Sequence, residues 1–243
     1  MRLPRLYAPG QPNLVEVRFV SLFDRVWETK EGPRLANATC DWFGRYVRQE
    51  KLQLHAWTLT PKRLCFVATP PNESNIAKVI QALGRCMAAH LRQGGVFMGR
   101  FHSALIEPAA WVLPAQIWVE RRSVADGFVP EPTAWAWSSA GQHAGKPVAS
   151  PGWAIALSDH EDYWGCGNTP FDRQAEYKRK LDAGLEDGET AQLEAALLGQ
   201  WALGSPKYID QLAKVANRRV QPGLRGRPRK HRDRLKGAPS LIN

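Results

Sequence analysis

The sequence lacks several features that would place the chain outside the bacterial-type cytoplasm. It has no run of about 18 uncharged apolar residues, so no membrane-spanning helix and no membrane partner are expected. Met1 to Arg5 lead into no apolar segment, which argues against a secretory signal. The four cysteines are scattered without a CxxC pair, and a zinc site or a disulfide framework is therefore not expected.

What the sequence does contain is typical of a folded globular protein with a basic end. Of its 243 residues, 44% are hydrophobic and 23% are charged, with a formal net charge of +10. Ten of the 33 Lys and Arg residues lie between Lys214 and Lys236, where Asp233 is the single acid. The rest of the chain is nearly neutral, with 23 basic and 22 acidic residues. Such a basic segment usually acts as an interaction tail.

A short pattern within this tail favours DNA binding over simple solvation. The pattern is that of an AT-hook and consists of Arg225, Gly226, Arg227, Pro228, Arg229 and Lys230. Glycine allows the backbone to approach a groove floor, and proline holds the segment extended. The arginine side chains then fit a narrow A·T-rich minor groove, where the negative potential is enhanced. We therefore expect an association with duplex DNA and with the nucleoid.

Hydrophobic periodicity in the first half of the chain predicts an α+β fold. Strands are expected at residues 14–20, 52–59, 63–69 and 101–106, and helices at 35–51, 74–92 and 109–121. The order β-α-β-β-α-β is typical of a ferredoxin-like sandwich, with an antiparallel sheet and its helices on one face. Further helices are expected at 171–184, 189–201 and 206–218, the last beginning at Ser205 and Pro206.

These patterns divide the chain into four predicted regions. The first is the ferredoxin-like domain at residues 1–130, followed by a Trp-rich packed loop region at 131–169. A helical C-terminal region at 170–220 and the basic tail at 221–243 complete the chain.

Seven short segments occur in the order known from one protein family. They are Arg5-Leu6-Tyr7-Ala8-Pro9-Gly10, Ala56-Trp57-Thr58-Leu59-Thr60-Pro61, Gly99-Arg100-Phe101, Val124-Ala125-Asp126-Gly127-Phe128-Val129, Trp135-Ala136-Trp137-Ser138-Ser139-Ala140, Gly204-Ser205 and Gly226-Arg227-Pro228-Arg229-Lys230. In these segments the chain resembles the REP-associated tyrosine transposases, which belong to the single-tyrosine HUH transposases. The resemblance spans nearly the whole chain and implies a transposase-like domain at 1–130 that acts on single-stranded DNA beside a hairpin.

The resemblance also implies a chemistry for which this chain has the wrong residues. In the family a Tyr hydroxyl attacks a phosphodiester, and His residues of one strand hold a divalent metal. The metal-ligand positions are here Arg63, Cys65 and Arg122, and the nucleophile position is Trp118. An indole forms no phosphoester, a guanidinium offers no lone pair, and one thiol suits Mg²⁺ or Mn²⁺ poorly. We expect no catalytic residue, no metal and no cofactor, as in an inactive, domesticated relative.

The same positions predict a phosphate-binding face. Lys62, Arg63, Arg100, Arg121 and Arg122 are expected to gather where the family brings its DNA, and arginine pairs phosphate oxygens well. Hairpin or single-stranded DNA is then the expected partner of this face. Two alternatives stay open. One is an active transposase that forms a phosphotyrosine with shifted residues, and the other is a protein-interaction module that the tail tethers to DNA.

Overall fold

The protein, described here from a computed structural model over residues 4–146 and 155–223, is built around one antiparallel sheet. Its strands are β1 (Asn13–Arg18), β2 (Gln53–Leu59), β3 (Arg63–Thr69) and β4 (His102–Leu105), in the order β2-β3-β1-β4. The mixed α/β character and the antiparallel sheet are thus confirmed. Over the two described ranges, no helix combines the length and apolar character needed to cross a bilayer.

The other regular elements of the described residues are helices. They are α1 (Ser21–Trp27), α2 (Gly32–Gln49), α3 (Asn75–Leu91), α4 (Val112–Glu120), α5 (Arg122–Ala125), the short 3₁₀ helix η1 (Pro132–Ala134), α6 (Ala140–His143), α7 (Glu161–Trp164), α8 (Pro170–Ala183), α9 (Asp187–Gly199) and α10 (Pro206–Leu212). The hairpin at 52–59 and 63–69 is confirmed, as is Ser205 at the start of α10, whose Oγ accepts the Tyr208 N–H.

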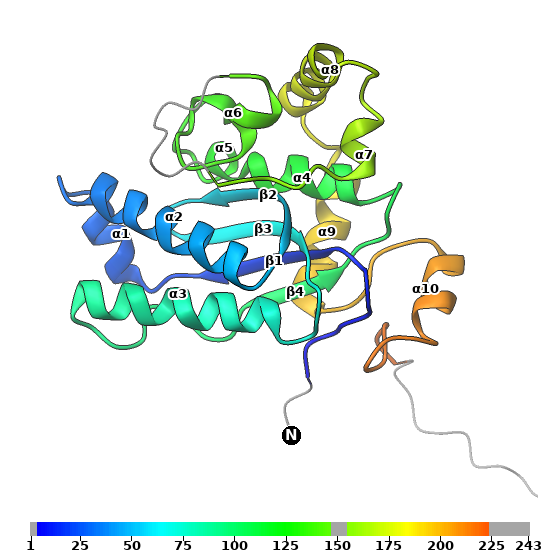
Figure 1. The fold of residues 1–243 in the computed structure, drawn as a ribbon, viewed down its shortest axis with the longest axis horizontal. Coiled ribbons are helices and arrows are strands. Elements are labelled where there is room, and N and C mark those ends of the chain that lie inside the picture. The colour runs from blue at the N-terminus through cyan, green and yellow to red at the C-terminus, as the bar shows by residue number, and fades with distance from the viewer. Residues whose placement is uncertain (1–3, 147–154, 224–243) are drawn as a thin grey trace, which may run out of the picture.

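The first face of the sheet carries the larger core. Side chains of a strand alternate between its faces, so Val15 and Val17 of β1 point to the same side as Leu64 and Phe66 of β3. They pack against α2 and α3, which lie in front of the sheet in Figure 1. This is the arrangement that the sequence predicts for its two long amphipathic helices.

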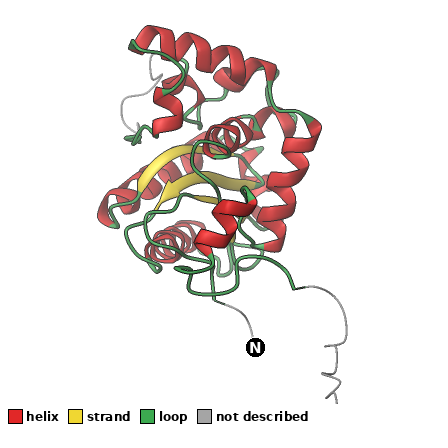
Figure 2. Ribbon diagram, turned by 90° about the vertical axis from the view of Figure 1, so that its right-hand side faces the viewer, coloured by secondary structure: helices red, strands yellow, loops and turns green. Residues whose placement is uncertain are grey.

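The second face of the sheet is covered as well. Leu14 and Cys65 lie on this side and pack with Val119 of α4 and Leu193 of α9, behind the sheet in Figure 1. Figure 2 shows helices on both sides of the strands. The helices within the ferredoxin-like order, α2 and α3, lie on one face, and α4 and α9, which the prediction did not place, cover the other. They are needed because β1 and β3 bury apolar side chains on both faces.

A buried carboxylate ties the second half of the chain to α4. Glu120 is fully buried and accepts hydrogen bonds from Ser139 Oγ (2.5 Å), His143 Nδ1 (2.6 Å) and Tyr177 Oη (2.8 Å). These donors lie just before α6, at its end and in α8, so one side chain joins three elements. The described part of the Trp-rich region is thereby packed on the sheet domain. The proposed boundaries at 130, 169 and 220 stay predictions.

The two buried faces generate a prediction about α9. Leu193→Ala removes a fully buried side chain of the second core, and we expect it to lower the free energy of unfolding by about 2–5 kcal/mol. The matched control is Leu198→Ala in the same helix, where the side chain is 68% exposed and the expected effect is below about 0.5 kcal/mol. Urea unfolding measures both, and equal effects would show that α9 is not part of the core.

Candidate functional site

Three adjoining hollows lie along the sheet end where β1 finishes and β3 begins. The central cavity, of about 310 Å³, is lined by Glu16, Arg18, Arg63, His102, Trp118, Arg122, Glu194, Leu197 and Leu198. The hairpin hollow, of about 460 Å³, shares Arg18 and Arg63 with it and adds Lys62. The terminal pocket, of about 540 Å³, shares His102 with the central cavity and adds Arg5, Arg100 and Arg218. We call the three together the groove.

Strand alternation brings the polar side chains of the central cavity together. Glu16 pairs with Cys65 on one side and with His102 on the other, while Arg18 pairs with Arg63. These positions all fall on the face that α4 and α9 cover, at the end of the sheet that the two helices leave partly open. The cavity is therefore a direct product of the register between β4, β1 and β3.

The helix side of the central cavity is formed by a cation resting on an indole ring. Trp118 and Arg122 are four residues apart, which places them on the same side of α4 and α5. The guanidinium carbon of Arg122 lies 4.0 Å from the centre of the Trp118 ring, a cation–π contact. The structure thus brings Arg63, Trp118 and Arg122 into one cavity.

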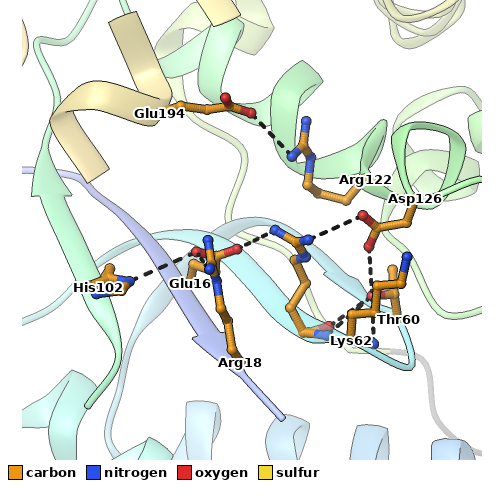
Figure 3. A network of polar contacts seen from close by, with 9 residues as sticks. Glu16, Arg18, Thr60, Lys62, His102, Arg122, Asp126 and Glu194 are labelled. Atoms are coloured by element: carbon orange, nitrogen blue, oxygen red, sulfur yellow. Dashed lines mark hydrogen bonds and ion pairs between the residues drawn. The ribbon is translucent and has the colours of Figure 1, made fainter. Parts of the chain in front are cut away.

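Two buried carboxylates, Glu16 and Asp126, both labelled in Figure 3, hold Arg63 in place. Its guanidinium lies 2.6 Å from Glu16 and 3.3 Å from Asp126, and Glu16, with its side chain 3% exposed, also pairs with Arg18 at 3.1 Å. Burial disfavours the charged form of Arg63, but the carboxylates of Asp126 and Glu16 outweigh it and raise its pKa. Arg63 is therefore a fixed cation. Asp126 also accepts a hydrogen bond from Thr60 at 3.2 Å.

Arg122 is held less firmly than Arg63. Its Nη1 lies 3.4 Å from the carboxylate of Glu194, as Figure 3 shows, and the Glu194 side chain is 51% exposed. An exposed carboxylate at this distance is a weak partner that water and salt screen. Arg122 can therefore exchange it for another anion at small cost.

Cys65 lies beneath the central cavity, packed among apolar side chains. Burial raises the pKa of its thiol well above the ordinary value, followed by the repulsion from Glu16, so the group is a protonated thiol. Across the described ranges, no set of three His, Cys, Asp or Glu side chains is placed to hold a metal ion.

The five tyrosines lie elsewhere, and none lines one of the three hollows. Tyr7 donates to the carbonyl of Pro71, and Tyr208 to that of Ile106. Tyr163 and Tyr177 are buried beside His143 and Glu120, whereas Tyr46 contacts Cys86. Each hydroxyl already has a partner away from the groove.

The remaining residues of the predicted phosphate-binding face are separated. Lys62 lines the hairpin hollow, where its ammonium lies 5.5 Å from the ring centre of Phe128. Arg100 lines the terminal pocket. Arg121 points away and donates to the carbonyls of Leu181 (2.6 Å) and Asp182 (3.1 Å) near the end of α8, where a cation suits the helix dipole. The predicted AT-hook residues, 225–230, lie outside the described residues.

Sequence reasoning missed three basic residues that the structure adds to the groove, namely Arg5, Arg18 and Arg218. Arg18 lies two residues after Glu16 on β1, so strand alternation places both side chains on the same face of the sheet. This pattern could have identified Arg18 from the sequence. Arg5 and Arg218 meet only in the folded chain. Together the three hollows are lined by seven Lys and Arg side chains and by two carboxylates, Glu16 and Glu194.

Several N–H donors of the groove are buried without an acceptor among the described residues. In the central cavity they are Arg63 Nε, Arg122 Nε and Trp118 Nε1, and beside the terminal pocket they are Arg5 Nε and Arg218 Nε. Buried donors are nearly always paired in folded proteins. The excess of basic over acidic side chains along the groove suits the oxygens of a phosphate.

Comparison with known proteins adds one structural similarity. No family model and no curated protein matches the chain. A solved structure described as a REP-associated tyrosine transposase bound to a REP hairpin is similar over 67% of this chain and 96% of its own, with 14% identity and a TM-score of 0.48. A similarity of this extent does not by itself establish a shared fold or function.

The ion pairs of the central cavity generate a prediction about stability. Arg63→Gln leaves the buried Glu16 without its closest cation and is expected to lower the free energy of unfolding by about 3 kcal/mol. Arg18→Gln, whose side chain is 49% exposed, removes the other arginine of Glu16 and is expected to lower it by less than about 1 kcal/mol. Denaturant unfolding at neutral pH compares the two, and similar losses would contradict the assignment of Arg63 as the fixed partner.

Proposed function

We propose that this chain is a DNA-binding relative of the single-strand DNA transposases that holds a DNA backbone in the groove without cleaving it. The observation that carries the proposal is the groove itself, which is lined by seven basic side chains against two carboxylates. Nucleic-acid backbones supply both the negative charge and the acceptor oxygens that such a surface lacks.

The basic side chains of the groove have two roles. One shapes the central cavity, and the others bind the phosphate oxygens of DNA. Arg63 is clamped by Glu16 and Asp126 and gives the cavity its shape. Arg18, Lys62 and Arg122 are exposed or weakly paired, and these are the groups that we assign to phosphate oxygens. A strand lying from the hairpin hollow into the central cavity would meet them in turn.

We also assign the sheet and its first two long helices to the ferredoxin-like topology. The strand order β2-β3-β1-β4, antiparallel throughout, and the position of α2 and α3 on one face support this assignment. Two of the segments that resemble the transposases contribute Arg5, Gly99 and Arg100 to the terminal pocket. Arg63, Trp118 and Arg122 then stand where the resemblance places the metal ligands and the nucleophile.

The absence of cleavage follows from the chemistry of these side chains. Transfer of a phosphoryl group to the protein needs a hydroxyl or similar nucleophile, and the indole of Trp118 has none. Two guanidinium groups beside it repel a divalent cation, and the Cys65 thiol is buried and protonated. The groove is therefore assigned to recognition alone.

The basic tail is assigned to duplex DNA on the strength of its sequence. Arg225 to Lys230 carry the AT-hook pattern, which suits an A·T-rich minor groove. A hairpin with a single-stranded flank offers both substrates in one molecule. When tail and groove engage the same molecule, each raises the effective concentration of DNA at the other.

Binding through the groove predicts a change in salt dependence. The double variant Arg18→Gln, Lys62→Gln is expected to weaken binding of a flanked hairpin and to reduce the slope of log affinity against log salt by about 1.4, or about 0.7 for each lost phosphate contact to a single strand. The matched control is Arg45→Gln, Arg85→Gln, which removes the same charge from the helices on the opposite face. Fluorescence anisotropy over a salt series measures both slopes, and identical slopes would refute groove binding.

A second experiment separates recognition from catalysis. An end-labelled, hairpin-tailed oligonucleotide incubated with the protein and Mg²⁺ or Mn²⁺ is expected to stay intact, because the central cavity offers no hydroxyl nucleophile. Denaturing electrophoresis measures the intact fraction. Cleavage that disappears when one of the five tyrosines is changed to Phe would instead establish an active transposase with a displaced nucleophile.

A further inference from the structure

We propose that the terminal pocket binds a phosphomonoester, such as the phosphate at the end of a DNA strand. The pocket is distinct from the central cavity and is lined by Pro4, Arg5, Met98, Gly99, Arg100, His102, Gly199, Gln200, Trp201 and Arg218. For a strand end, the proposal rests on the proposed function and extends it. The volume of the terminal pocket, about 540 Å³, lies within the range of small-ligand sites, so a nucleotide fits as well as a phosphate group.

Neutral groups hold the two inner arginines of this pocket. Arg5 donates to the side-chain oxygen of Gln200 and to the carbonyl of Phe101. Arg218 donates to the carbonyls of Gln200 and Arg219. These acceptors fix both guanidinium groups but cancel none of their charge. Among the described residues that line the pocket there is no carboxylate, in contrast to the central cavity.

The pKa of Arg5 reflects its burial and the positive charges around it. Burial, followed by the charges of Arg100 and Arg218, lowers the pKa of Arg5 to about 10. The group remains protonated at neutral pH, but its charged form is disfavoured by its neighbours. An anion between these side chains would offset that repulsion.

Aromatic rings support the guanidinium groups from the other side. Arg5 lies over the ring of Phe101 at 4.3 Å and Arg218 over that of Trp201 at 5.1 Å. Gly199 leaves room for this arrangement, because a Cβ there would collide with the Trp201 ring. The rings restrict the motion of both arginines, so less conformational entropy is lost when an anion binds.

The charge of the pocket favours a phosphomonoester over a phosphodiester. A monoester carries between one and two negative charges near neutral pH, because its second pKa is about 6, and it presents three terminal oxygens. A diester of the DNA backbone carries a single charge. Arg5 and Arg218, whose guanidinium groups are held by neutral acceptors, match the more highly charged group better.

The test compares one single-stranded oligonucleotide with a 5′-phosphate, a 3′-phosphate or hydroxyls at both ends, by fluorescence anisotropy. We expect the full chain to bind one phosphorylated form about tenfold more tightly than the hydroxyl form. Arg218→Gln should abolish this preference, so that the variant binds the phosphorylated and hydroxyl forms with equal affinity. Arg100→Gln, at an exposed side chain, should weaken it without affecting folding. The matched control Arg219→Gln lies next in the chain and outside the pocket lining, and should keep the preference.

A second measurement separates this proposal from the proposed function. Thermal unfolding with a nucleoside monophosphate should show a rise in Tm for the wild-type chain and for Arg219→Gln, but not for Arg218→Gln. If no oligonucleotide binds and this rise persists, DNA binding is refuted and the phosphate pocket stands. If oligonucleotides bind with no preference for a terminal phosphate and the nucleotide leaves Tm unchanged, the pocket proposal is overturned while the proposed function stands.

Discussion

The carboxylate of Glu16, buried on the second face of the sheet, sets the chemistry of the candidate site. A charge in that position requires cations, and Arg63 and Arg18 supply them from neighbouring positions on β3 and β1. Arg63 is then drawn to Asp126 as well, which joins the strand to the turn after α5. The central cavity exists because these side chains occupy the sheet end instead of apolar ones, and the helices there do not close over them.

The groove contains two electrostatic regimes side by side. In the central cavity Arg63 is held by two buried carboxylates, so its charge mainly organises the protein, whereas Arg122 has only the exposed carboxylate of Glu194. In the terminal pocket Arg5 and Arg218 are oriented by carbonyls and an amide, so their charge is available to a ligand. The distinction matters because an arginine near a binding surface contributes little to affinity when a buried acid already satisfies it.

Local pattern was sufficient for much of the fold. Period-two alternation located β1, turn residues bounding two short runs located β2 and β3, and the apolar stripe of residues 74–92 located α3. The cover on the second face was not predictable in the same way, because α9 comes from a distant part of the chain and its apolar residues do not form one clear stripe. For the site, strand register explains why Arg63 faces Glu16. The helix geometry did not reveal that Arg121 would turn to the end of α8 while Arg122 turned to the cavity.

The late position of α9 has a consequence for how the protein is made. All four strands have been synthesised once residue 105 emerges from the ribosome, and α4 follows within 15 residues, but Leu193 and Leu197 emerge far later. During that interval a nascent sheet would present part of an apolar face to the surrounding solution. Folding intermediates with exposed apolar surface are prone to associate with one another, so chaperone dependence during translation should be governed by the delay before α9 arrives.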